Sequence, residues 1–107
     1  MKAEPTLFEK ESFAGKRLPR EEYIDCTFRR CDFTGADMRG CSFVECRFEH
    51  CDLSTARWTN ATLRDVRFSD SKLLGAAFCD CNPFLWSADF EACRMDFALL
   101  SGMRLKK

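Results

Sequence analysis

The stretch CTFRRCDFTGADMRGCSFVECRFEHCDL, residues 26–53, repeats with a period of five. A small residue, Cys or Ala, is followed two places later by a large apolar residue, and this pair returns every five residues. An α-helix has 3.6 residues per turn, so a step of five would spread these side chains over every face. In one long strand, an odd step would send successive members to opposite faces. Neither structure alone accounts for the period.

The period continues through eleven consecutive repeats. The large members are Phe28, Phe33, Met38, Phe43, Phe48, Leu53, Trp58, Leu63, Phe68, Leu73 and Phe78. The small or medium members two places earlier are Cys26, Cys31, Ala36, Cys41, Cys46, Cys51, Ala56, Ala61, Val66, Ser71 and Ala76. The pattern is accommodated if the chain turns a corner after every repeat, so that each repeat points the same two residues inward. Repetition at a short fixed period is typical of a solenoid.

These units resemble those of the pentapeptide-repeat family, whose loose consensus is A(D/N)LXX. The matching tandem units are CTFRR, CDFTG, ADMRG, CSFVE, CRFEH, CDLST, ARWTN, ATLRD, VRFSD, SKLLG and AAFCD. The resemblance covers about residues 23–105 and implies an all-β fold, a right-handed quadrilateral parallel β-helix with four repeats to each coil. Residues twenty apart would then stack about 4.8 Å from one another, as in any sheet.

Two regions are expected along the chain. Residues 1–22 keep the step of five, but the residues two before each large member are polar, so we expect an imperfect N-terminal coil that caps the rod. Residues 23–107 are expected to form the β-helix of about four coils, with a two-residue insertion near 82–86. The series fails at Pro83, which cannot donate a ladder hydrogen bond and therefore suits a bulge at a corner.

From the sequence we expect no matching cap at the C-terminal end. Four large residues are expected at this end: Phe90, Met95, Leu100 and Leu105. An open strand edge invites pairing with another chain, so the sequence predicts a homodimer through this end. A natural protein that continues beyond this sequence is the alternative.

Several apolar residues of the C-terminal third occupy positions that the pattern sends outward. The candidates for an interaction surface are Leu74, Phe84, Trp86, Phe97 and Leu99. Clustered exposed apolar residues mark interfaces, and Trp and Phe are frequent anchors in them. The alternative is a local plug that fills the bulge.

Eight cysteines in 107 residues suggest a disulfide scaffold or a metal site at first sight. Seven of them, however, occupy the inward small position: Cys26, Cys31, Cys41, Cys46, Cys51, Cys81 and Cys93. The spacing is C-x4-C-x9-C-x4-C-x4-C, whereas structural zinc sites favour two close pairs with two to four residues between ligands, and a core role explains all seven cysteines with one rule. We therefore expect reduced core cysteines and no metal. Cys79 falls outside the pattern and is the expected exposed thiol.

Composition excludes other classes. The 17 Lys and Arg residues balance the 17 Asp and Glu residues, which predicts no direct nucleic-acid binding and no membrane binding. The N-terminal segment lacks the apolar core of a secretory signal, so a cytoplasmic location is expected. His50 is placed outward at a corner, the carboxylates lie on surface positions, and a glycine-rich phosphate loop is absent. The sequence therefore predicts no catalytic residues, no cofactor and no enzyme activity.

These observations predict a non-enzymatic scaffold that mediates protein–protein interaction and self-associates through its C-terminal end. The family resemblance implies an alternative, because some pentapeptide-repeat proteins bind DNA gyrase or topoisomerase IV by resembling duplex DNA and protect these enzymes from quinolones. Those relatives are generally acidic and longer rods, whereas this chain is neutral and short. A second alternative is a metal or redox sensor that uses the cysteines.

Overall fold

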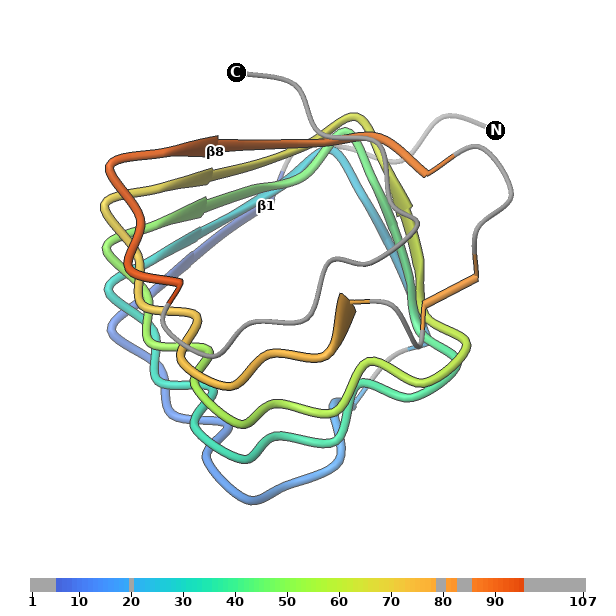
Figure 1. Ribbon diagram of the computed structural model, residues 1–107, viewed down its shortest axis with the longest axis horizontal. Helices are drawn as coiled ribbons and strands as arrows, with labels where there is room; N and C mark the ends of the chain where they lie inside the picture. The colour runs from blue at the N-terminus through green and yellow to red at the C-terminus, as the bar shows by residue number, and fades with distance from the viewer. Residues whose placement is uncertain (1–5, 20, 79–80, 83–85, 96–107) are drawn as a thin grey trace.

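A computed structural model describes residues 6–19, 21–78, 81–82 and 86–95. The chain winds into an all-β parallel solenoid of about four turns, which confirms the predicted fold class. Seen along the rod, each coil is four-sided (Figure 1). Within the described ranges, no helix is long and apolar enough to cross a membrane.

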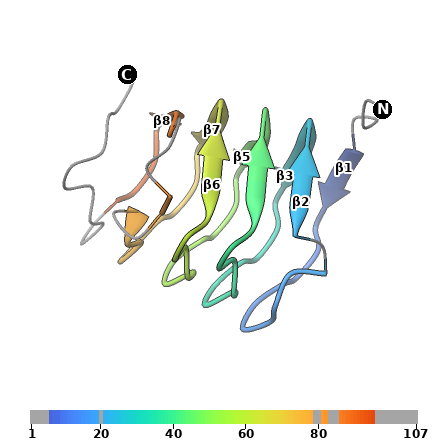
Figure 2. The same cartoon turned by 90° about the vertical axis from the view of Figure 1, so that its right-hand side faces the viewer.

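Two parallel sheets form two of the four faces. The five-stranded sheet has the order β1 (Thr6–Glu9), β3 (Cys26–Arg29), β5 (Arg47–Glu49), β7 (Val66–Ser69) and β8 (Ala88–Glu91). The three-stranded sheet has the order β2 (Glu22–Ile24), β4 (Ser42–Val44) and β6 (Thr62–Arg64). Figure 2 shows their strands stacked coil upon coil along the rod. The other two faces are joined by single bridges, such as Asp32 with Asp52 and Asp37 with Arg57.

The register between coils is constant over most of the rod. Partners are twenty residues apart from β1 to β7, and Phe48 faces Phe68. Between β7 and β8 the offset is 22, since Val66 faces Ala88. Asn82 N donates to Ala61 O, just as Thr62 N donates to Cys41 O one coil earlier, so the register is still unchanged at Asn82. The two additional residues therefore enter the chain between Asn82 and Ala88.

A left-handed backbone conformation at the corners explains the period of five. The residue two places after a large inward residue has a positive φ, as in Arg30 (54°) and His50 (52°). Glycine supplies the conformation at Gly35 (65°), where a side chain would be strained. A strand alternates inward and outward residues, and the corner resets this alternation. Every repeat can therefore begin with an inward residue.

The core consists of side-chain columns that run along the rod. The rings of Phe28 and Phe48 stack with their centroids 4.9 Å apart, and those of Phe48 and Phe68 are 5.0 Å apart. Phe8 continues this column below Phe28 at 4.9 Å, so the N-terminal coil shares the same ladder. Phe28, Phe48 and Phe68 are fully buried. Side chains thus fill the inside of the solenoid, and the outward positions are the ones available to a partner.

Candidate functional site

The cysteines were the first candidates for chemistry, and they lie inside. All seven described cysteines are free thiols, and six are buried as predicted. Cys93, near the C-terminal end of the described chain, is half-buried. Cys79 lies outside the described residues. The described part of the chain contains no group of three or more ligands that could hold a metal ion.

The buried thiols are engaged by backbone carbonyls. The thiol of Cys51 donates to Phe28 O at 3.1 Å, and that of Cys46 donates to Tyr23 O at 3.3 Å. Burial raises the pKa of both Cys46 and Cys51 to about 12. A thiol must lose its proton to act as a nucleophile or a metal ligand. These residues are therefore poorly suited to redox sensing or metal binding.

His50 also lacks the surroundings of a catalytic base. Its Nε2 atom lies 3.8 Å from Asp70 Oδ2, and about half of each side chain is exposed to solvent (54% and 52%). The described thiols near this corner point inward, so His50 forms no nucleophile–base pair with them. We interpret His50 as a solvated corner residue.

The structure corrects one of the predicted interaction residues. Trp86 was expected to face outward, and this expectation is wrong, because Trp86 is only 9% exposed. Its ring packs on Phe78 with the centroids 5.6 Å apart, which fits the plug alternative. The insertion interrupts the five-residue alternation just before residue 86, so the pattern no longer fixes which way that side chain points. Leu74 is half-buried, whereas Phe84, Phe97 and Leu99 lie outside the described residues.

The candidate dimer end is described only in part. Phe90 and Met95 are half-buried and pack against the core, and Phe90 stacks on Phe68 at 5.1 Å. Leu100 and Leu105 lie outside the described residues. Association through this end therefore stays a prediction.

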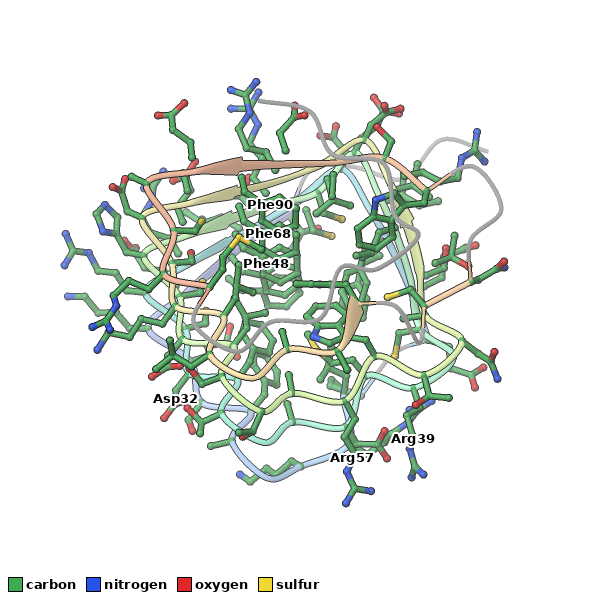
Figure 3. All side chains as sticks on the ribbon, in the orientation of Figure 1. Asp32, Arg39, Phe48, Arg57, Phe68 and Phe90 are labelled. Carbon is green, nitrogen blue, oxygen red and sulfur yellow. The ribbon has the colours of Figure 1, made fainter. Side chains whose placement is uncertain are left out.

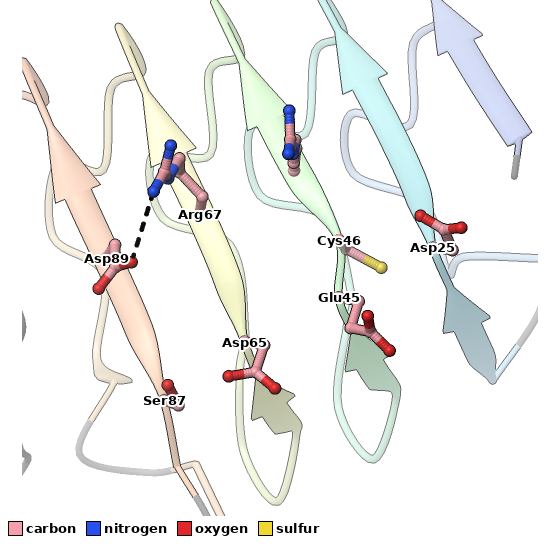
Figure 4. A pocket seen from close by; sticks show the side chains of 8 residues that line it. Asp25, Glu45, Cys46, Asp65, Arg67, Ser87 and Asp89 are labelled. Carbon is pink, nitrogen blue, oxygen red and sulfur yellow. Dashed lines mark ion pairs between the residues drawn. The ribbon is translucent and has the colours of Figure 1, made fainter.

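A groove along one corner of the rod is a surface feature that sequence reasoning did not identify. It lies between the three-stranded and five-stranded sheets and has a volume of about 270 Å³ (Figure 4). We call it the corner groove. It is lined by Asp25, Glu45, Cys46, Arg47, Asp65, Arg67, Ser87 and Asp89.

Both signs of charge line the corner groove in separate rows. Asp25, Glu45 and Asp65 occupy the same corner in three successive coils, about 4.8 Å apart, and within the described chain they form no ion pair. Arg47 and Arg67 face each other on β5 and β7 beside this row. Asp89 Oδ2 lies 3.9 Å from Arg67. The signal was present in the sequence as acidic residues twenty apart at corner positions, but it becomes visible only when the coils are stacked.

A second group of charges, on a face of the rod, is satisfied internally. Asp37 Oδ2 lies 2.9 Å from Arg39, and its Oδ1 atom lies 3.2 Å from Arg17. The hydrogen bond from Arg39 holds the pKa of Asp37 well below its usual range. This network stabilises a turn and leaves Asp37 little capacity to bind a partner.

The comparisons with known proteins agree with the architecture. The model of the "Pentapeptide repeat region" matches residues 5–78. Among solved structures, a pentapeptide repeat protein from the thylakoid lumen of Arabidopsis thaliana is 19% identical, with a TM-score of 0.59 over 95% of this chain and 70% of that one. QnrB1, a plasmid-mediated fluoroquinolone resistance protein, is 20% identical with a TM-score of 0.53.

The match to QnrB1 covers 88% of this chain but 48% of QnrB1, so the chain spans about half the length of that relative. At these identities, the likeness to solved structures establishes the fold alone. No curated protein matches the chain. Since the family model covers more than half of the sequence, the chain belongs to the pentapeptide repeat family.

Proposed function

We propose that this protein is a non-enzymatic rod that binds another protein, with the corner groove as its contact surface. The observation that carries the proposal is the carboxylate row of Asp25, Glu45 and Asp65, which forms no ion pair within the described chain. The inside of the solenoid is filled by side chains, and burial raises the pKa of the Cys46 and Cys51 thiols to about 12. Recognition therefore falls to the outward residues.

The charges of the corner groove favour a protein partner over a nucleic acid. A row of carboxylates repels phosphates, whereas it attracts lysine or arginine side chains. The neighbouring Arg47 would then select an acidic residue at the next position of the partner. The free cysteines support a reducing compartment, and we therefore propose a cytoplasmic location.

The test is affinity capture from the source cytosol, with Asp65→Lys as the disrupting variant. The matched control is Glu22→Lys, which makes the same change of charge at an exposed residue on β2. The proposal expects a partner that the wild type and Glu22→Lys retain and that Asp65→Lys loses. A partner retained equally by all three proteins would exclude the corner groove as its contact.

A second candidate function is binding of DNA gyrase or topoisomerase IV. It is motivated by a fold shared with a fluoroquinolone resistance protein, although this chain is neutral and spans about half of that relative. The measurement is gyrase supercoiling with and without a fluoroquinolone, as the purified protein is titrated. Dose-dependent inhibition or drug protection would support this function, and the absence of any effect from folded protein would reject it.

The apolar C-terminal region is the third surface to consider. We retain Leu74, Phe90 and Met95 as candidate contacts there, since all three are half-buried. Phe90→Arg would abolish self-association through this end. If a homodimer persists unchanged in this variant, the C-terminal end is not the interface.

A further inference from the structure

One outer face carries an ordered column of charges. Asp32, Asp52, Lys72 and Arg94 follow one another in four successive coils, each bridged through its backbone to the next. We call these four residues the charge column. Asp32, Lys72 and Arg94 are exposed, Asp52 is half-buried, and Asp32 points away from the rod (Figure 3). The column is therefore negative in two adjacent coils and positive in the next two.

This order is unfavourable in an isolated rod. Like charges that lie directly opposite each other on neighbouring strands repel, and here Asp32 stacks on Asp52 at about 4.8 Å. Within the described chain, Asp32, Asp52 and Lys72 form no ion pair. Elsewhere opposite charges pair between neighbouring coils, as Arg29 and Glu49 do at 3.1 Å. Asp32, Asp52 and Lys72 thus keep their charges available for a partner.

The acidic half of the column is also held in place. Thr34 N donates to Asp32 Oδ1 at 2.9 Å, and Ser54 N donates to Asp52 Oδ1 at 3.0 Å. These bonds fix both carboxylates before a partner arrives, which lowers the entropy cost of association. The outward residues beside the two acids, Thr34 and Ser54, are small, so another surface can approach the acids closely, and Leu74 lies at the equivalent position beside Lys72.

We propose that the charge column is the interface of an antiparallel, side-by-side homodimer. A two-fold axis perpendicular to the rod, passing between the coils of Asp52 and Lys72, reverses the order of coils in the second copy. Asp52 then faces Lys72 of the second copy, and Asp32 faces its Arg94. Such a self-complementary patch is the signature of a two-fold interface, in which each contact occurs twice.

The adjoining corner is compatible with this arrangement. His50 would lie at the level of the second copy's Asp70, and Arg30 at the level of its Ala92. Neither contact places like charges together. The face is only about 20 Å long over four coils, which is small for a stable interface. We therefore expect an affinity in the micromolar range, weakened by salt because the attraction is electrostatic.

The first experiment measures mass by sedimentation for the full chain at about 0.05 M and about 0.5 M salt. The proposal expects a dimer at high protein concentration that dissociates at the higher salt. Asp52→Lys alone and Lys72→Asp alone place like charges opposite each other, so each is expected to weaken association at least about tenfold. The proposal is overturned if the wild type stays monomeric at low salt up to a protein concentration of roughly several hundred micromolar.

Mixing the two single variants tests whether the charges at residues 52 and 72 pair across the interface. The base introduced by Asp52→Lys in one protein would then face the acid introduced by Lys72→Asp in the other, and the reverse contact is also complementary. We expect a 1:1 heterodimer by native mass spectrometry, with an affinity within about threefold of the wild type. The double variant Asp52→Lys/Lys72→Asp should likewise dimerise. A mixture that remains monomeric overturns the proposed charge pairing, and a dimer insensitive to either single change overturns the interface.

A single variant on the basic side protects the test against misfolding. Asp52→Lys removes the hydrogen bond from Ser54, so circular dichroism must first confirm the fold. If that variant is unfolded, Lys72→Asp still tests the contact alone, and it is expected to weaken association as above. Glu22→Lys is the matched control, since it changes the charge of an exposed residue on β2, outside the charge column, and should leave the dimer intact.

Discussion

The thiol of Cys51 donates a hydrogen bond to the carbonyl oxygen of Phe28, 3.1 Å away in the preceding coil. The same thiol lies 3.4 Å from Glu49 O, two residues earlier in its own coil. Cys51 thus satisfies carbonyls beside a corner, where the chain changes direction. One coil further along, Ser71 occupies the equivalent position, and its hydroxyl lies 3.3 Å from Phe48 O. A small polar donor, rather than sulfur chemistry, is what this position requires.

Cys51→Ser should therefore leave the rod nearly as stable as the wild type. We expect the free energy of unfolding to change by less than about 1 kcal/mol, because the serine hydroxyl can replace the thiol as the donor. Cys51→Leu is the contrasting variant and should cost roughly 1–3 kcal/mol by overpacking a filled position. Urea unfolding followed by circular dichroism measures both. Equal losses in the two variants would contradict the role of the donor.

The buried thiols should make the protein sensitive to alkali. The folded pKa of Cys46 and Cys51 is about 12, above the value of about 8.5 for an exposed thiol. Their contribution is complete below about pH 8.5 and is lost as the pH rises toward 12, since the unfolded chain then releases protons that the folded chain retains. The slope has an upper bound of about 1.4 kcal/mol per pH unit for each thiol.

The measurement is the thermal midpoint at about pH 7.5, 9 and 10.5. The wild type should lose stability steadily above pH 8.5. The double variant Cys46→Ala/Cys51→Ser is the control and should show a clearly shallower decline. Parallel curves for the two proteins would mean that other groups cause the alkaline loss.

The solenoid could be predicted from the sequence because each inward residue packs on its counterpart in the next coil, so the same residue type recurs at a fixed spacing. Phe48 on Phe68, at 5.0 Å, is the contact that a twenty-residue offset predicts. The orientation of Trp86 was not predictable, because the preceding insertion breaks the alternation on which the pattern depends. The corner groove could not be predicted for a different reason. Its acidic residues are twenty positions apart in the sequence and form a row only when the coils stack.

The ring column predicts a strong dependence of stability on its central members. Phe48 is fully buried between Phe28 at 4.9 Å and Phe68 at 5.0 Å. Phe48→Ala should lower the free energy of unfolding by about 3–5 kcal/mol, through lost burial and an unfilled cavity. Phe8→Ala is the matched control at the half-buried start of the column and should cost about half as much. Denaturant titration measures the free energy of unfolding of both variants. An equal loss of stability in Phe48→Ala and Phe8→Ala would contradict a cooperative column.

The network around Asp37 predicts a modest loss of stability in acid. The hydrogen bond from Arg39 lowers the pKa of Asp37, so its contribution is present above the unfolded value of about 3.9 and is lost as the pH falls below it. Because both arginines are partly exposed, Asp37→Asn should cost only about 0.5–1 kcal/mol at pH 7. The difference between wild type and variant should shrink when the thermal midpoints are compared near pH 3. A constant difference would refute an ionic contribution.

Trp58 is a buried core residue whose indole N–H group forms no hydrogen bond within the described chain. Within the described chain, its Nε1 atom is buried and has no hydrogen-bond partner, although the side chain is only 1% exposed. An unsatisfied buried donor costs about 1–3 kcal/mol. The next member of its column, Phe78, shows that a phenyl ring fits this face of the core, with the two centroids 5.1 Å apart.

Trp58→Phe should therefore be nearly neutral despite the loss of a large aromatic side chain. Removing the unsatisfied N–H offsets a cavity penalty of roughly 1 kcal/mol, so the net change in the free energy of unfolding should stay below about 1 kcal/mol. Trp58→Ala, which removes the ring entirely, should cost about 3–5 kcal/mol. Both are measured by urea unfolding followed by circular dichroism, which does not depend on the lost tryptophan fluorescence. A loss above about 2 kcal/mol in Trp58→Phe would mean that the indole N–H has an acceptor in solution, such as a buried water.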